Sequence, residues 1–315
     1  MDGHWHDHWI DTKSNGGRFL RSEAQFRNWI TADGTAGPSG GGGFKAEADR
    51  YHLYIGNACP WAHRAIIFRS LKGLDGKIGL SVVHWFMAEH GWTFAPGDGV
   101  IADPINAAQY AYEIYLAADP LYSGRVTIPV LWDKDRNTIV SNESSEIIRM
   151  FNSAFDEPGA TSVDYYPVHL RDEIDRLNAR VYDTVNNGVY KCGFATSQQA
   201  YNEAIEPLFA SLDWLEGLLE ERKYLVGESV TEADWRLFTT LIRFDPVYVG
   251  HFKCNKRRLI DYPNLSRLTR DLYAHPGVAE TVDMEHIKNH YYASHESINP
   301  SRVVPAGPAS FIGEF

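Results

Sequence analysis

The sequence predicts an α/β domain followed by an all-helical domain. Between residues 51 and 155, stretches typical of strand, helix and strand follow one another, and a hairpin and a further helix come after them. Between residues 165 and 293, apolar residues recur every three or four positions, which is the period of an amphipathic helix. The chain has 315 residues, which is enough for two domains of about 100–200 residues each.

Changes of composition predict the domain boundaries. Residues 1–45 are expected to form an N-terminal arm, because they end in the glycine-rich loop 34–43 and show no extended apolar pattern. The α/β domain is expected at 46–155 and the helical domain at 165–293. Residues 294–315 contain three prolines and little periodicity, and they are expected to form a C-terminal tail.

Composition limits the class of protein. The net charge of −11 argues against a nucleic-acid-binding protein and against binding to anionic membranes. No run of about 18 apolar residues predicts a membrane span. Three cysteines do not suit a disulfide scaffold, and the N-terminus has neither the basic nor the apolar region of a secretory signal, so a cytoplasmic location is expected.

The first residues of the chain contain three histidines that could be metal ligands. His4, His6 and His8 alternate with other side chains, which would bring three imidazoles to one side of an extended chain. No further group of ligands has the defined spacing of a metal site, so no metal is expected.

The stretch 51–64 carries the clearest chemical signal. An alternating apolar strand ends in a turn, and Cys59 and Pro60 then precede a helical pattern. Proline suits the first turn of a helix, because its missing N–H would have no partner within the helix. Free N–H groups and the helix dipole favour a thiolate at such a position. Cys59 is therefore expected to be a nucleophile with a lowered pKa, and a buried structural cysteine is the alternative.

Two later segments have the features of a peptide-binding site. Pro129 interrupts the strand-like run 126–132, so this run is either an edge strand or contains a cis Ile128–Pro129 bond that turns the backbone of Ile128 outward, toward an extended peptide. Glu143 and Ser144 open a helix. They either cap it or bind a ligand, with Ser144 and backbone N–H groups on a carboxylate and Glu143 on an ammonium.

Other local patterns give more limited expectations. Residues 21–30 are expected to form a short helix, and the long insertion 87–124 is expected to be functional or partly disordered. In the second domain, Thr231 and Asp234 have the spacing of a capping box at a helix start.

The order of elements in the first domain is that of a thioredoxin-like domain. Together with an all-helical second domain it resembles the glutathione transferases, and four motifs resemble the Xi class, the glutathionyl-hydroquinone reductases. The motifs are CPWAHR at 59–64, GWTF at 91–94, RVTIPVL at 125–131 and IVSNESSEII at 139–148. The likeness extends over nearly the whole chain.

This resemblance implies a glutathione transferase fold, glutathione as co-substrate, glutathionyl-hydroquinones as substrates, and a homodimer formed through the helical domain. It implies that Cys59 is the nucleophile, that Tyr190 is the proton donor, and that Tyr248 and Tyr291 help to keep the cysteine ionised, with Tyr292 as the alternative to Tyr291. The glutathione contacts that it implies are Trp92, Arg125, Val126, Thr127, Ile128, Glu143 and Ser144.

The implied reaction is reductive removal of glutathione through a Cys59–glutathione mixed disulfide. Position 62 is alanine, so no Cys-x-x-Cys pair exists and dithiol reduction of the thioredoxin type is excluded. Two alternatives stand beside this function. One is an Omega-like thiol transferase or dehydroascorbate reductase, and the other is a non-catalytic binding protein with the same fold.

Overall fold

The computed structural model describes residues 3–7, 10–156 and 163–308. Contacts within the chain divide it into two compact units. The first comprises Met1–Asp7, Ser22–Asp164 and Glu280–His290, and the second comprises His8–Arg21, Tyr165–Ala279 and Tyr291–Phe315. Each unit therefore includes segments from both ends of the sequence.

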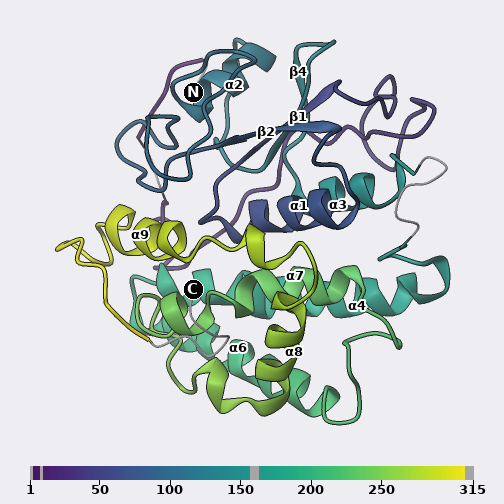
Figure 1. The fold of residues 1–315 in the computed structure, drawn as a ribbon. Helices are drawn as coiled ribbons and strands as arrows, with labels where there is room; N and C mark the ends of the chain where they lie inside the picture. The colour runs from purple at the N-terminus through teal and green to yellow at the C-terminus, as the bar shows by residue number, and fades with distance from the viewer. Residues whose placement is uncertain (1–2, 8–9, 157–162, 309–315) are drawn as a thin grey trace. The chain divides into compact units, whose positions relative to one another are not determined.

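A four-stranded mixed sheet forms the centre of the first unit, with the strand order β2-β1-β3-β4 (Figure 1). Its strands are β1 (Tyr51–Ile55), β2 (Ile78–Val82), β3 (Val130–Asp133) and β4 (Thr138–Ser141). β1 runs parallel to β2 and antiparallel to β3, with Tyr54 opposite Val130. All five residues of β1 are buried, as expected for a central strand that is covered on both faces.

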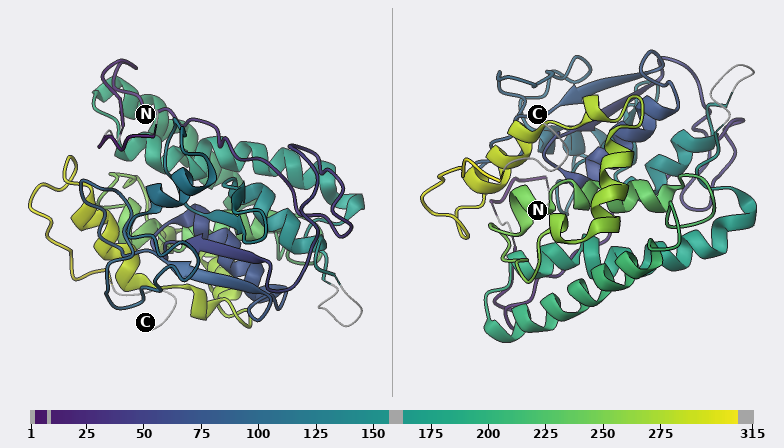
Figure 2. Two further views of the ribbon diagram at one scale, coloured as in Figure 1. Left: turned by 90° about the horizontal axis from the view of Figure 1, so that it is seen from above. Right: turned by 60° about the horizontal axis from the view of Figure 1, so that its bottom comes forward.

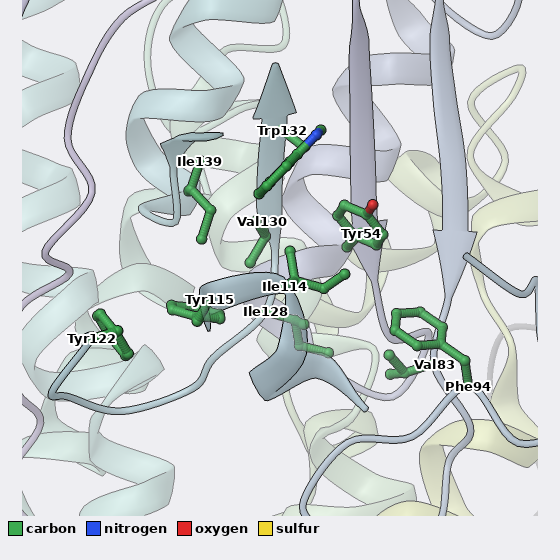
Figure 3. Close-up of a cluster of buried hydrophobic side chains, with 10 residues drawn as sticks. All are labelled: Tyr54, Val83, Phe94, Ile114, Tyr115, Tyr122, Ile128, Val130, Trp132 and Ile139. Atoms are coloured by element: carbon green, nitrogen blue, oxygen red, sulfur yellow. The ribbon is translucent and has the colours of Figure 1, made fainter. Parts of the chain in front are cut away.

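Helices cover both faces of this sheet. The helices α1 (Pro60–Leu71) and α3 (Ser144–Ser153) pack against each other on one face, and α2 (Ala111–Ala118) lies on the other (Figure 1). Figure 3 shows the core between α2 and the sheet, where Tyr115 of α2 lies near Val130 and Ile128. This arrangement confirms the predicted α/β domain.

One local prediction for this unit was wrong, and one open alternative is decided. Residues 21–30 do not form a helix. Their backbone runs beside the outer strand β4. Arg27 forms an isolated antiparallel β-bridge with Ser141, and the Asn28 N–H donates to the Val140 carbonyl at 2.9 Å. Pairing with an open strand edge satisfies these backbone groups without a helix. In the run 126–132 the Ile128–Pro129 bond is cis, and the strand β3 begins after it at Val130. β3 lies between β1 and β4, so it is not an edge strand.

The second unit is helical, as predicted. Its α-helices are α4 (Arg171–Val181), α5 (Gly188–Gly193), α6 (Gln198–Leu218), α7 (Glu232–Leu241) and α8 (Pro263–Tyr273), and α9 (Met284–Ser294) starts in the first unit and ends in this one. Short 3-10 turns are η1 (Val168–Leu170), η4 (Leu259–Asp261) and η5 (Ala279–Thr281), and π-helical turns are η2 (Tyr182–Asn186) and η3 (Phe244–Tyr248). Figure 2 shows the long helix α6, which packs along α5.

Helix α7 is the central element of the second unit. All ten of its residues are buried, and it contacts both α4 and α8. The predicted capping box is present at its start, where Asp234 Oδ2 accepts from the Thr231 N–H at 2.9 Å. The other oxygen of Asp234 accepts from the Leu225 N–H at 2.9 Å, so this carboxylate also fixes the preceding loop.

Candidate functional site

Sheet topology brings the predicted glutathione contacts of the first unit to one edge of the sheet. The chain leaves β1, β2 and β4 at this edge and enters β3 there, because β1 and β2 are parallel and β3 is antiparallel to its neighbours. Cys59 follows β1, Trp92 follows β2, Ile128 precedes β3 and Glu143 follows β4. Segments that are far apart in the sequence thus meet at the ends of adjacent strands.

Cys59 occupies the predicted position at the start of α1. It is the N-cap residue, with Pro60 as the first helical residue, and the first turn of the helix contains no acidic side chain. The Cys59 thiol lies 3.6 Å from the Ile128 carbonyl oxygen. Cys59 is only partly buried. A helix N-terminus free of carboxylates and partial exposure of the residue are features typical of a cysteine that reacts as a thiolate.

The loop before β3 is fixed from α2. The Ile128–Pro129 bond is cis, which is one of the two alternatives that the sequence left open. The Tyr115 hydroxyl donates to the Thr127 carbonyl at 2.7 Å and accepts from the Thr127 N–H at 3.2 Å. The Asn142 amide also donates to this hydroxyl, at 3.0 Å. A buried tyrosine therefore sets the position of the backbone that precedes Ile128.

The start of α3 combines capping with a possible ligand site. Glu143 is the N-cap, and its Oε1 accepts from the N–H and hydroxyl of Ser145 at 3.0 and 2.8 Å. The Arg64 guanidinium of α1, which is buried, donates to Ser144 Oγ at 3.4 Å. Because Arg64 occupies a lone pair of that hydroxyl, the Ser144 O–H is left to donate to an anion. Capping by Glu143 is thus confirmed, and it leaves Ser144 and the helix N-terminus suited to a carboxylate.

Trp92 packs between the sheet edge and the C-terminal segment of this unit. A Cβ atom added at Gly56 would lie 2.6 Å from Ile128 Cδ1 and 3.7 Å from Trp92 Cζ3, so the turn before Cys59, the cis-proline loop and Trp92 are in close contact. On its other side the Trp92 indole stacks on the His290 ring, with a centroid separation of 4.6 Å and an interplanar angle of 23°.

The segment 280–290 also contacts the residues on either side of Cys59. The Asn57 amide donates to Asp283 Oδ2 at 3.1 Å, and His63 Nε2 lies 2.9 Å from the Thr281 hydroxyl. The turn that precedes Cys59 and the first turn of α1 are therefore tied to a segment more than two hundred residues further along the chain.

The three predicted tyrosines form one hydrogen-bonded group within the second unit. The Tyr291 hydroxyl lies 2.6 Å from that of Tyr190 and 3.1 Å from that of Tyr248. The Tyr292 hydroxyl instead donates to the Pro246 carbonyl at 3.2 Å. Of the two candidates in α9, Tyr291 is thus the one that belongs to the group.

Burial decides the protonation of this group. Tyr248 and Tyr291 are fully buried, which raises the pKa of both phenols well above the ordinary tyrosine value, and the neighbouring Tyr190 raises them further. Both remain protonated at neutral pH. Tyr190 is only partly buried, in contrast to the other two tyrosines.

Comparison with known proteins identifies the family. The family model "Glutathione S-transferase, N-terminal domain" matches residues 58–154, and "Glutathione S-transferase, C-terminal domain" matches residues 198–270. The chain is 60% identical over 309 residues to YqjG of Escherichia coli K12, which is named a glutathionyl-hydroquinone reductase, and the match covers 98% of this chain and 94% of that protein. PcpF of Sphingobium chlorophenolicum, which is also named a glutathionyl-hydroquinone reductase, is 59% identical over 309 residues. This match covers 98% of this chain and 96% of PcpF.

Comparison with solved structures also identifies glutathione transferases. The glutathione-bound structure of YqjG superposes with a TM-score of 0.92 at 55% identity, over 99% of this chain and 96% of that one. The Xi transferase of Phanerochaete chrysosporium gives a TM-score of 0.89 at 53% identity, over 93% of this chain and 99% of that one. The chain belongs to the Xi class of glutathione transferases. The predicted fold class is thereby confirmed.

Several residues of this Xi transferase that contact the candidate site were not found from its sequence. Tyr115 and His290 contact the predicted residues from distant segments, and no local pattern marks either of them. Arg21 of the arm lies over the Tyr190 ring, with its guanidinium carbon 5.4 Å from the centroid, and donates to Asn187 at 2.9 Å. The cluster of aromatic residues and histidines near the N-terminus was the only available signal for the arm.

The remaining observations concern the other two cysteines, a metal and the membrane. Cys192 and Cys254 are buried, and burial raises the pKa of the Cys254 thiol well above its usual value, as suits packing residues. Of the histidines considered as metal ligands, His8 lies outside the described residues; within the described residues, no group of three or more His, Cys, Asp or Glu could hold a metal. None of the described helices has the length and apolar character needed to span a membrane.

Proposed function

We propose that the chain is a glutathionyl-hydroquinone reductase, which releases hydroquinones from their thioethers with glutathione. The names of two relatives that match 98% of the chain at about 60% identity support this activity. The observation that carries the proposed mechanism is the placement of Cys59. Its sulfur lies at a helix N-terminus, 3.6 Å from the carbonyl of a cis-proline loop, and it is the one cysteine of the first unit.

Glutathione binds, in this proposal, across the strand ends where Cys59, Ile128 and Glu143 lie. The backbone of Ile128 pairs with the extended tripeptide, and Arg125, Val126 and Thr127 line the same loop. The α-carboxylate of the glutamyl group accepts from Ser144 and from the N-terminus of α3, where the dipole favours an anion. Glu143 Oε1 is occupied by Ser145, so Oε2 is the oxygen that receives the ammonium group.

The first chemical step is attack of the Cys59 thiolate on the glutathione sulfur of the substrate. The new S–S bond forms as the bond between sulfur and ring carbon breaks, and the ring carbon takes the electron pair and a proton. The products are free hydroquinone and a Cys59–glutathione mixed disulfide. A second glutathione thiolate then attacks this disulfide, giving glutathione disulfide and the resting cysteine. The ring carbon gains two electrons, and two sulfur atoms supply them: that of the substrate's own glutathionyl group and that of one free glutathione, which end joined in glutathione disulfide.

Tyr190 supplies the proton to the ring carbon in this mechanism. Its hydroxyl is hydrogen-bonded to Tyr291, which is in turn bonded to Tyr248, so the phenolate formed by proton transfer gains support from a protonated neighbour. The Arg21 guanidinium over the Tyr190 ring adds a positive charge that favours the same phenolate.

We further propose that the protein acts in the cytoplasm as a homodimer formed through its helical domain, uses no metal, and has the domain boundaries expected from its sequence. Sedimentation analysis of the purified protein tests the dimer. A single species with the mass of one chain would contradict it.

Product analysis tests the proposed reaction. Purified protein is mixed with a glutathionyl-hydroquinone and excess glutathione, and hydroquinone and glutathione disulfide are measured together. Equal amounts of the two products are expected from wild type, and neither from Cys59→Ser. Reduction of dehydroascorbate without release of hydroquinone would favour the Omega-like activity, and glutathione binding without either reaction would favour a binding protein.

A further inference from the structure

The turn that carries Trp92 is contacted by two segments that are distant in the sequence, residues 3–7 and residues 280–290. This turn, residues 88–93, closes through a hydrogen bond from the Gly91 N–H to the Ala88 carbonyl at 2.8 Å. Neither the residues 3–7 nor the residues 280–290 fall within the two matched family models, which begin at residue 58 and end at residue 270. Both segments belong to the first unit and contact the Trp92 turn.

Trp5 of the arm packs on the backbone of the turn. Its indole N–H donates to the Glu89 carbonyl at 2.6 Å, and its ring stacks on Tyr112 with a centroid separation of 5.3 Å. A Cβ atom added at Gly91 would lie 2.8 Å from Trp5 Cη2, so the ring lies directly against the glycine backbone. Gly91 has a φ of +71°, a conformation that favours glycine, and this allows the close approach.

His290 packs on the side chain of Trp92. Its ring stacks on the Trp92 indole at a centroid separation of 4.6 Å, and its Nδ1 lies 2.8 Å from the Trp85 carbonyl oxygen. This polar contact fixes the plane of the imidazole, and His290 is buried. The plane of the Trp92 ring is therefore set by a partner that is itself fixed.

The backbone of the turn has further hydrogen bonds to neighbouring segments. The Trp92 carbonyl accepts from the Ala111 N–H at 2.9 Å, and the Thr93 carbonyl accepts from the His84 N–H at 2.8 Å. Both bonds lie at or after Trp92, whereas Trp5 contacts the residues before it. The Trp92 indole also packs on the core cluster that contains Ile128, so Trp5 and His290 supply part of what fixes its rotamer. Their loss would let the indole move more, and binding would have to select one orientation at an entropic cost.

We propose that Trp5 and His290 are positioning residues, which hold the Trp92 indole in the orientation that binds glutathione. This inference rests on the proposed role of Trp92 as a glutathione contact. It assigns to the N-terminal arm a function in substrate affinity. Loss of either residue weakens binding of glutathione and of the glutathionyl substrate alike, and leaves the chemistry at Cys59 unchanged.

Steady-state kinetics and glutathione titration on the full chain test the inference. Trp5→Ala and His290→Ala are each expected to raise KM and the glutathione Kd about fivefold, with kcat within about twofold of wild type. Trp5→Phe keeps the ring contact and is expected to restore most of the affinity. The matched control is His6→Ala, because His6 is the exposed neighbour of Trp5 in the same arm; this variant is expected to bind as wild type does.

A double-mutant cycle with Trp92→Ala separates positioning from general destabilisation. If Trp5 acts through Trp92, adding Trp5→Ala to Trp92→Ala causes no further loss of affinity. Additive losses, or a fall in kcat with KM unchanged, would overturn the inference. Failure of the proposed function is distinguishable, because wild type would then release no hydroquinone whatever its glutathione Kd. If Trp92 is not a glutathione contact, Trp92→Ala alone leaves that Kd unchanged.

Amide hydrogen exchange gives an independent readout. Trp5→Ala is expected to speed exchange in residues 88–93 and to leave α1 as protected as in wild type. Unchanged exchange in the turn would contradict a positioning role for the arm.

Discussion

A phenol donates a proton at neutral pH only while it holds one, and it assists catalysis only where a substrate can reach it. Tyr190 is the partly exposed member of the tyrosine group. Tyr190→Phe is expected to lower kcat for hydroquinone release about 10²- to 10⁴-fold, the usual contribution of a general acid. The control is Tyr292→Phe, because the Tyr292 hydroxyl bonds the Pro246 carbonyl instead of this group. Equal kcat values for the two variants would exclude Tyr190 as the donor.

In the proposed glutathione site, Arg64 is expected to contribute to binding through Ser144. It is buried, stacks over Trp61 with 4.5 Å between its guanidinium carbon and the ring centroid, and donates to Ser144 Oγ. Arg64→Met is expected to raise the glutathione Kd about 10- to 100-fold, the range for a lost hydrogen bond to a charged group. Calorimetric titration measures this. In a Ser144→Ala background the same substitution should have a much smaller effect, and an undiminished effect would show that Arg64 acts by another route.

Residues in local motifs of the candidate site could be predicted, and those that contribute through tertiary contacts could not. Cys59 and Glu143 were predicted at helix starts because capping and proline preferences act over a few positions, and both occupy those positions. Trp5 and His290 lie more than eighty residues from their contacts. Such contacts depend on which segments pack together, and no periodicity in the sequence encodes that choice.

The capping box at the start of α7 is expected to make the unfolding free energy depend on pH. Burial raises the pKa of Asp234 to about 6, from 3.8, although the carboxylate accepts hydrogen bonds from Leu225 and Thr231. The folded state therefore holds this proton more tightly than the unfolded state, and the stabilisation is complete below about pH 3.8 and lost as the pH rises through about 6. Wild type should lose about 3 kcal/mol of unfolding free energy from this group over that range.

Asp234→Asn removes this titration and keeps an acceptor for Leu225. Urea unfolding of both proteins between pH 4 and 7 measures the effect, and the variant is expected to lack the loss that wild type shows. Parallel pH profiles for the two proteins would show that Asp234 keeps an ordinary pKa in the folded state.

The elements themselves illustrate where sequence patterns suffice. The predicted strand of the stretch 51–64 is β1, and the helical pattern after Cys59 is α1, which begins at Pro60. Both depend on preferences that act over a few neighbouring residues. Residues 21–30 were predicted as a helix, but they extend beside β4, since an open strand edge offered partners for their backbone. Local preference was overridden there by pairing with a distant segment.

At the scale of the molecule, buried tyrosines set the alkaline limit of stability. Burial raises the pKa of several phenols in both units: Tyr51, Tyr54, Tyr115, Tyr122, Tyr248 and Tyr291. In the unfolded chain these groups lose their protons near pH 10, so the folded state binds more protons above that pH. The unfolding free energy should therefore fall as the pH rises above about 10.

Tyr248→Phe isolates one of these groups. The variant is expected to reduce the slope of unfolding free energy against pH above pH 10 by about 1.4 kcal/mol per pH unit. Urea titrations at a series of alkaline pH values measure the slope. An unchanged slope would mean that Tyr248 ionises in the folded protein.

The central claim is that Cys59 takes glutathione from the substrate as a covalent intermediate. Intact-protein mass spectrometry after mixing with one equivalent of a glutathionyl-hydroquinone, without free glutathione, tests it most directly. We expect one glutathione adduct, located on Cys59, formed together with free hydroquinone, cleared by added glutathione and absent from Cys59→Ser. Release of hydroquinone with no adduct on Cys59, or an adduct of equal yield in the variant, would contradict it.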